Sequence, residues 1–133
     1  MKKIIPTKKA PAPVGPYSPV VGFHDLIFVS GQGPLDPKTQ ALVSGTVQEE
    51  ARQTLENIKD ILEDVGSSLD NVLKVTAYLS DMNNFADFNE VYREFFPANA
   101  PARTCIQAGR LPFDIKVEID VIACKNKAEK SGT

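Results

Sequence analysis

Hydrophobic residues recur with a helical period in the middle of the chain. An apolar stripe at spacings of four and three runs from Ala51 to Val65 and predicts a helix over about residues 48–65. The four residues before it, Thr-Val-Gln-Glu at 46–49, match a capping box, in which the hydroxyl and the carboxylate satisfy unpaired amides. Gly66 follows, where a glycine is typical of a helix C-terminus. This stretch therefore has the start, the apolar face and the end of one amphipathic helix.

A second helical stripe consists of aromatic residues between Phe85 and Phe96. Polar residues at 81–84 offer side chains that can cap its start, and Pro97 ends it. We expect the aromatic side chains to pack in the core.

Period-two alternation and short apolar runs predict strands elsewhere. The predicted strands and extended segments are residues 2–5, 17–21, 26–30, 42–46, 71–80, 102–108 and 116–124. Residues 36–39, Asp-Pro-Lys-Thr, fit a type I turn, so we expect 42–46 to return as a hairpin partner of 26–30.

The alternation also predicts which side chains share a face of the sheet. In segment 71–80, one face should carry Leu73, Val75, Ala77 and Leu79, and the other Val72, Lys74, Thr76 and Tyr78. We expect Arg103 and Glu118 to lie with Lys74 and Thr76 on a face of mixed polarity, which is typical of a surface covered by another chain. The order of elements predicts an α+β fold with one mixed β-sheet and two helices packed on one face.

Length and composition fit a single domain over residues 1–133, with partly flexible ends at 1–10 and 125–133. The formal charge is −2 and the pI about 5.4, which disfavours non-specific nucleic-acid binding. The sequence contains no apolar stretch long enough for a membrane span and no recognisable signal peptide. We therefore expect a cytoplasmic protein.

The two cysteines and the single histidine limit the possible chemistry. Cys105 and Cys124 have no close Cys or His companions, which argues against a zinc site. His24 stands alone, so a mechanism that needs two histidines is excluded.

Arg103 and Glu118 are the candidate functional residues. The guanidinium of Arg103 presents a planar set of donors that suits a carboxylate, and Glu118 could activate water as a general base. Spacing alone favours a structural role for both residues, with Arg103 as a surface arginine or part of an ion pair and Glu118 as a solvated strand carboxylate. Cys105 is expected beside Arg103, but no base is placed near it, so it is interpreted as a packing residue.

Several short motifs occur in a specific order from about residue 10 to residue 123. They are Gly-Pro-Tyr-Ser at 15–18, Phe-Val-Ser-Gly-Gln at 28–32, Pro-Leu-Asp-Pro at 34–37, Thr-Leu-Glu-Asn-Ile at 54–58, Asp-Met-Asn-Asn-Phe at 81–85, Asn-Glu-Val-Tyr at 89–92, Pro-Ala-Arg-Thr-Cys at 101–105, Leu-Pro at 111–112 and Val-Glu-Ile-Asp-Val at 117–121. In this order they make the chain resemble the reactive intermediate deaminase family, also called RidA or YjgF.

The resemblance implies a chorismate-mutase-like fold assembled as a homotrimer, with sites in the clefts between subunits. It implies hydrolysis of 2-imino acids such as 2-iminobutanoate and 2-iminopropanoate, and of their enamine tautomers, to 2-oxo acids and ammonia. It also implies that no cofactor or metal takes part, and the charge and hydropathy given above lead us to expect neither nucleic acid nor a membrane as a partner.

The family's site residues are carried over by position. Arg103 matches the residue that binds the substrate carboxylate, and Glu118 the one that holds or activates water. The implied substrate-binding residues are Tyr17, Ser30, Gly31, Asn89 and Cys105. Three departures from the family pattern, Pro19, Gly33 and Asp114, affect the expected pocket; Pro19 should stiffen the segment of Tyr17, and Gly33 should enlarge the pocket.

Two other functions remain open at this point. Some members of the superfamily lack the arginine and are binding modules, and a ribonuclease activity is reported for some relatives. The presence of both Arg103 and Glu118 disfavours the first alternative, and the single histidine and low pI disfavour the second.

Overall fold

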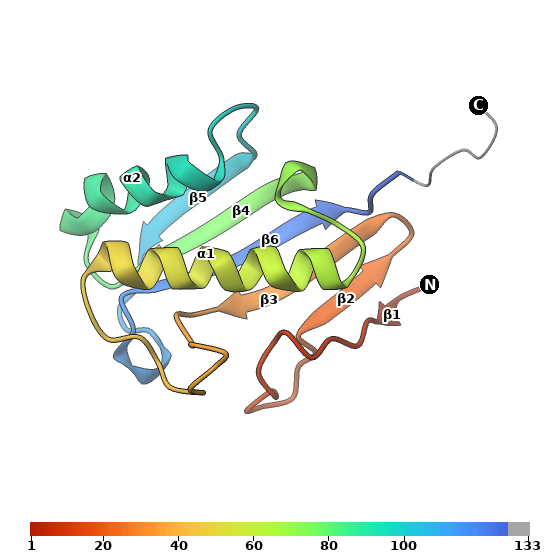
Figure 1. Cartoon of the computed structure of the whole chain (residues 1–133), viewed down its shortest axis with the longest axis horizontal. Helices are drawn as coiled ribbons and strands as arrows, with labels where there is room; N and C mark the ends of the chain where they lie inside the picture. The colour runs from red at the N-terminus through yellow and green to blue at the C-terminus, as the bar shows by residue number, and fades with distance from the viewer. Residues whose placement is uncertain (128–133) are drawn as a thin grey trace.

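One six-stranded sheet carries the fold, with both long helices on one of its faces (Figure 1). The computed structural model describes residues 1–127. The strands are β1 (Lys3–Ile4), β2 (Val20–Phe23), β3 (Leu26–Gln32), β4 (Val72–Leu79), β5 (Ala102–Gln107) and β6 (Val117–Cys124). The helices are α1 (Val47–Asp64) and α2 (Phe85–Phe95), with short 3₁₀ turns η1 (Leu69–Asn71), η2 (Met82–Asn84) and η3 (Pro112–Asp114).

The strand order is β1-β2-β3-β6-β4-β5. Every neighbouring pair is antiparallel except β4 and β5, which are parallel because α2 carries the chain back between them. The predicted α+β fold with one mixed sheet and two helices on one face is confirmed.

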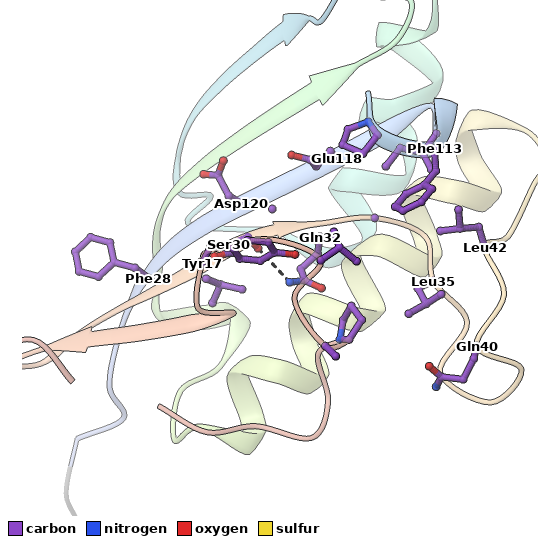
Figure 2. A pocket seen from close by; sticks show the side chains of 18 of the residues that line it. Tyr17, Phe28, Ser30, Gln32, Leu35, Gln40, Leu42, Phe113, Glu118 and Asp120 are labelled. Atoms are coloured by element: carbon purple, nitrogen blue, oxygen red, sulfur yellow. Dashed lines mark hydrogen bonds between the residues drawn. The ribbon is translucent and has the colours of Figure 1, made fainter. Parts of the chain in front are cut away.

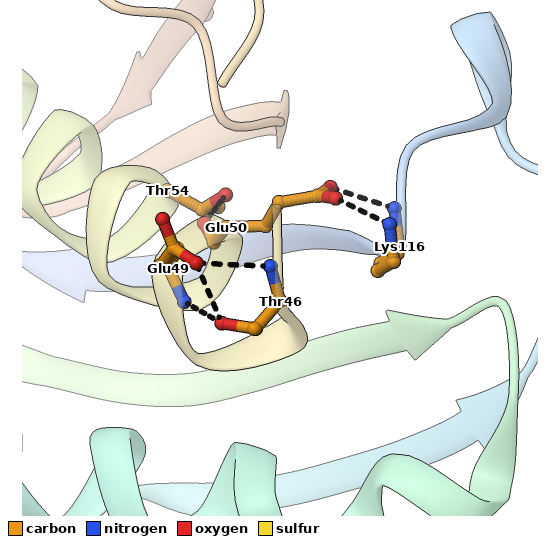
Figure 3. A network of polar contacts seen from close by, with 5 residues as sticks. All are labelled: Thr46, Glu49, Glu50, Thr54 and Lys116. Carbon is orange, nitrogen blue, oxygen red and sulfur yellow. Dashed lines mark hydrogen bonds and ion pairs between the residues drawn. The ribbon is translucent and has the colours of Figure 1, made fainter. Parts of the chain in front are cut away.

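Helix α1 begins and ends as its sequence predicts, within one residue. The Thr46 hydroxyl accepts from the Glu49 N–H at 3.1 Å, and the Glu49 carboxylate accepts from the Thr46 N–H at 3.2 Å (Figure 3). Gly66 follows with φ of +88°, a conformation that glycine adopts without steric cost. The buried face of α1 and the aromatic face of α2 cover the buried side chains of β3, β4 and β6, and together they form the core.

A buried carboxylate ties α1 to the start of β6. Glu50 is 2% exposed, and its two oxygens accept from the Lys116 N–H at 2.8 Å and from Lys116 Nζ at 3.2 Å (Figure 3). Charge-assisted hydrogen bonds of this kind are stronger than neutral ones. Glu50 therefore holds Lys116 at the start of β6, and Glu118 follows Lys116 by two residues.

The expected strand at 42–46 is wrong. Those residues lie in the long connection from β3 to α1, which is closed by one isolated bridge between Leu35 and Leu42 and by a Val43 N–H bond to the Pro34 carbonyl at 2.8 Å. The reason is that β3 already pairs with β2 on one side and β6 on the other, so neither of its edges is free for a hairpin partner.

The predicted faces of β4 are wrong at the start of the strand. Val72 is 6% exposed and Leu73 is 48% exposed, the reverse of the expectation. The register against β6 shifts between Val72 and Lys74, and such a bulge turns one side chain to the opposite face. From Val75 onward the predicted alternation holds.

The chain ends are partly held by the sheet. The predicted edge strand at 2–5 is present as β1, which pairs with β2. Beyond β6, the Lys125 N–H donates to the Asp25 carbonyl at 2.8 Å and the Asn126 N–H to the Gly66 carbonyl at 2.9 Å, so these two residues are anchored. The rest of the expected flexible tail, 128–133, lies outside the described residues. Within the described chain, the helices are too short or too polar to cross a membrane.

Candidate functional site

A cavity of about 920 Å³ lies between the segment before β2, strands β3 and β6, and the η3 turn (Figure 2). Its wall is mainly apolar and aromatic, with a few polar side chains. The residues that line it include Tyr17, Phe28, Ser30, Gly31, Leu35, Leu42, Phe113, Ile115, Glu118 and Asp120.

Glu118 faces this cavity because side chains alternate along β6. Val117 and Ile119 are buried under the helices, which sends the carboxylate between them to the opposite face of the sheet. Gly31 lies against it: a Cβ at Gly31 would come within 2.5 Å of Glu118 Oε2. A side chain at Gly31 would therefore displace the carboxylate.

The electrostatic surroundings of Glu118 favour its neutral form. Burial raises the pKa of the Glu118 carboxyl, and the nearby Asp120 charge adds to the effect. Asp120 also accepts a hydrogen bond from the Tyr78 hydroxyl at 3.1 Å. A raised pKa brings a carboxyl closer to the working range of a general acid or base near neutral pH.

Ser30 and Tyr17 complete this part of the cavity. The Ser30 hydroxyl donates to the Ser18 carbonyl at 2.6 Å, and the Ser30 N–H donates to the Pro19 carbonyl at 2.9 Å. These bonds hold the segment of Tyr17 beside β3.

Arg103 lies in a different environment, between β5 and α2. Its Nη1 donates to Asn89 Oδ1 at 2.8 Å, and its guanidinium carbon lies 4.6 Å from the ring centroid of Tyr92. The rings of Phe85 and Phe88 are 5.5 and 5.9 Å away, so α2 supplies an aromatic surround. Within residues 1–127 Arg103 forms no ion pair with an acidic side chain.

The expectation that Arg103 and Glu118 share one face of the sheet is wrong. Arg103 is in register with buried Val75, on the helix side, whereas Glu118 is in register with Tyr78, on the open side. The error arose because periodicity shows which residues of one strand share a face but does not relate the faces of two different strands.

One chain therefore carries two separate groups of the predicted site residues. We call Arg103, Asn89 and Cys105 the arginine group, and Tyr17, Ser30, Gly31 and Glu118 the glutamate group. The first lies between β5 and α2, and the second lines the cavity on the open face.

Cys105 follows Arg103 on the same face of β5, as predicted, in register with Ala77. Burial raises the pKa of its thiol, and the Arg103 charge opposes this only in part. The thiolate is the nucleophilic form, so this environment does not favour a covalent role.

Sequence reasoning missed two features of these groups. The aromatic stripe was assigned to the core alone, yet Phe85 and Tyr92 also surround Arg103; their helical spacing to Asn89 was the available signal. Sequence reasoning also missed that Gly33, which lines the cavity, makes room for Ile115 in the same wall, because a Cβ at residue 33 would lie 2.8 Å from Ile115 Cδ1.

Comparison with known proteins identifies the family. The family model described as endoribonuclease L-PSP matches residues 7–125. The chain belongs to this family. The resemblance to RidA/YjgF proteins is thereby confirmed, since solved members of that group have the same fold.

Three relatives illustrate the match. A RutC family protein of Pyrococcus horikoshii is 50% identical over 125 residues, covering 94% of this chain and 99% of the relative. The Escherichia coli protein described as putative reactive intermediate deaminase TdcF is 43% identical over 129 residues, covering 95% and 99%. The crystal structure of E. coli TdcF with bound serine has a TM-score of 0.85 at 42% identity and covers 93% and 99%. The structure of the E. coli YjgF gene product has a TM-score of 0.86 at 40% identity, with the same coverage.

Proposed function

We propose that this protein hydrolyses reactive 2-imino acids and their enamine tautomers to 2-oxo acids and ammonia, at sites formed between the copies of a homotrimer. The substrates proposed are small imino acids such as 2-iminobutanoate and 2-iminopropanoate. Two properties of the E. coli TdcF relative support a small substrate related to amino acids: its description as a putative reactive intermediate deaminase and the serine bound in its crystal structure.

The observation that carries the proposal is the environment of Arg103. A half-buried guanidinium with no acidic partner in the described chain is held in one orientation by Asn89 and by aromatic rings. Desolvated charges are normally paired, so this arrangement favours an anionic ligand. A planar carboxylate matches the donor geometry of the guanidinium.

The separation of the two groups supports a site shared between copies. The arginine group offers a cation for a carboxylate but has no carboxylate or imidazole that could act as a base, and the glutamate group has a proton acceptor but no cation among its residues. Contact between the arginine group of one copy and the glutamate group of the next would supply both functions in one cleft.

The proposed reaction needs positioning more than strong activation. Arg103 holds the substrate carboxylate, and the enamine takes up a proton from solvent at C3 to give the iminium. Water beside Glu118 adds to C2 and gives a proton to the Glu118 carboxylate, forming a carbinolamine. Glu118 passes this proton to the amino nitrogen and takes up the hydroxyl proton as the C–N bond breaks, which releases ammonia and leaves the 2-oxo acid; Glu118 then loses its proton to solvent. The iminium is already electrophilic, so correct orientation supplies much of the acceleration.

A coupled assay tests the activity. A threonine dehydratase generates 2-iminobutanoate, and 2-oxobutanoate release is timed with and without this protein. We expect faster release with the protein; an unchanged rate over a wide range of protein concentration would refute the proposed function.

Subunit mixing tests the shared site. Arg103→Ala and Glu118→Gln are each expected to be nearly inactive, but unfolding and refolding them together should restore about a quarter of the parent activity, because that fraction of interfaces then combines an intact Arg103 with an intact Glu118. No recovery in mixed trimers would show that the two residues do not share a site across an interface.

Ribonuclease activity is the second candidate, because the family model carries the description of an endoribonuclease. The single histidine, His24, lies in the exposed turn between β2 and β3 and does not line the cavity. RNA cleavage that co-purifies with the parent but is lost in Arg103→Ala would favour this candidate; equal cleavage by both would indicate a contaminant.

A further inference from the structure

The η3 turn places a large apolar side chain at the cavity. Phe113 lines the cavity together with Glu118, yet it is 72% exposed to solvent. An isolated exposed phenylalanine needs no explanation, but this ring is located at the wall of the cavity that Glu118 also lines.

The backbone at this position is strained and well anchored. Phe113 and Asp114 have φ of +59° and +55°, which is unusual for a bulky residue. Buried Leu111 and Ile115 hold the two ends of the turn. The side chain of Arg110 donates two hydrogen bonds, of 2.7 and 3.1 Å, to the carboxylate of Asp114. Strain of this kind is often found at functional sites, and here it holds the ring outside the core.

The ring belongs to one apolar part of the wall. Leu35, Leu42, Phe113 and Ile115, which we call the apolar end, all line the cavity, and Figure 2 shows the first three on the side of the view away from Phe28. Glu118 lies on the same cavity. A substrate whose C2 reacts at Glu118 therefore has an apolar surface within the cavity for its side chain.

We infer that Phe113 sets substrate selectivity: it forms the contact at the apolar end that favours 2-imino acids with larger apolar side chains over those with a single methyl group. This inference rests on the proposed function and names the substrate class of the same site. A single methylene group in an apolar pocket accounts for a preference of about 10- to 200-fold, so a larger apolar side chain can be favoured by at least that range.

The experiment compares two substrates made in the same way. An L-amino-acid oxidase with catalase generates the imino acids of leucine and alanine, and 2-oxo acid release gives kcat/KM for each. In Phe113→Ala, we expect the ratio of the leucine-derived to the alanine-derived value to fall at least about 10-fold. Phe113→Leu, which keeps an apolar side chain, should retain most of the preference.

Phe23→Ala is the matched control, because Phe23 is also an exposed phenylalanine but does not line the cavity. It should leave both kcat/KM values unchanged.

An unchanged ratio in Phe113→Ala, with both rates measurable, would overturn the inference while leaving the proposed function intact. Loss of the assembly in Phe113→Ala, seen by light scattering, would overturn it in favour of an interface role. If the parent accelerates neither reaction, the proposed function fails and the inference fails with it.

Discussion

Arg103 is the residue on which the proposed carboxylate contact depends. Its loss removes a charge-assisted interaction of about 1.5–3 kcal/mol, or about 10- to 150-fold in kcat/KM. Arg103→Ala should lower imino-acid hydrolysis by at least this factor, and Arg103→Lys should recover only a small part because lysine lacks the planar donors.

The measurement for Arg103 is the coupled assay at matched protein concentration, with Arg93→Ala as control. Arg93 is an exposed arginine on the same helix as Asn89. Full activity in Arg103→Ala with the fold unchanged would show that another residue binds the carboxylate.

The pH dependence should report the titration of Glu118. Only the ionised carboxylate can accept a proton from water, so kcat/KM should rise as pH rises through its pKa. Asp120 is one cause of the raised pKa, so Asp120→Asn should move the acid limb of the profile to lower pH. Glu118→Gln should lose most of the activity, and the activity that is left should no longer show this acid limb.

Asp25→Asn is the control for the pH profile, since Asp25 lies in the exposed turn between β2 and β3. An acid limb that stays in place in Asp120→Asn would mean that a group other than Glu118 controls the profile.

The hydroxyl of Tyr92 is buried and has no hydrogen-bond partner among residues 1–127. Burial raises the pKa of Tyr92 to about 12, against the opposing effect of Arg103, so the group stays protonated. An unsatisfied buried hydroxyl costs about 1–3 kcal/mol, and Tyr92→Phe should increase the free energy of unfolding by that order while keeping the ring beside Arg103.

Urea unfolding at fixed protein concentration measures the effect of Tyr92→Phe. Tyr78→Phe is the matched comparison. It should lower the free energy of unfolding, because it removes the hydrogen bond from the Tyr78 hydroxyl to Asp120. A loss of stability in Tyr92→Phe would show that its hydroxyl finds a partner in the assembled protein.

At the scale of elements, the Glu50–Lys116 contact links α1 to β6. Glu50→Ala leaves the Lys116 N–H without its acceptor, and hydrogen bonds to charged groups contribute about 1.5–3 kcal/mol. We expect a loss of that size in urea unfolding. Glu63→Ala, an exposed glutamate on the same helix, should change the stability by less than about 0.5 kcal/mol. Equal effects of the two variants would contradict this role of Glu50.

The elements themselves were largely predictable because their signals are local. Capping at Thr46, the aromatic spacing after Phe85 and the alternation from Val75 each depend on near neighbours in sequence. The errors occurred where distant pairing decides the outcome. The strand expected at 42–46 cannot pair with β3, because β2 and β6 occupy both edges of β3, and the bulge that exposes Leu73 depends on the register against β6.

The same limit applies to the candidate site. The resemblance supplied the residue types, but no sequence pattern placed Arg103 and Glu118 on opposite faces of the sheet. Phe113 was missed because its importance depends on a positive φ and a nearby cavity, neither of which its sequence neighbours specify.

At the scale of the whole molecule, the open face of the sheet has the mixed surface expected of an interface. Phe28 and Ile106 are exposed there beside polar side chains. We expect light scattering to give three times the chain mass of 14.5 kDa. Ile106→Lys should shift this to the monomer, because burial of an unpaired ammonium group is costly.

Asp60→Lys, on the solvent-exposed side of α1, is the control for that substitution and should remain trimeric. A parent protein that scatters as a 14.5 kDa monomer at micromolar concentration would contradict the proposed assembly.

The last strand of the sequence occupies the middle of the sheet. β3 and β4 do not touch each other as neighbours; β6 lies between them and pairs with both. The strands β1, β2 and β3 therefore cannot pair with β4 and β5 until β6 has been synthesised. A chain without β6 would have two unpaired strand edges, one on β3 and one on β4, and such edges promote aggregation. Chains that lack β6 should consequently be substrates for chaperones and proteases, because the two parts of the sheet cannot pair without it.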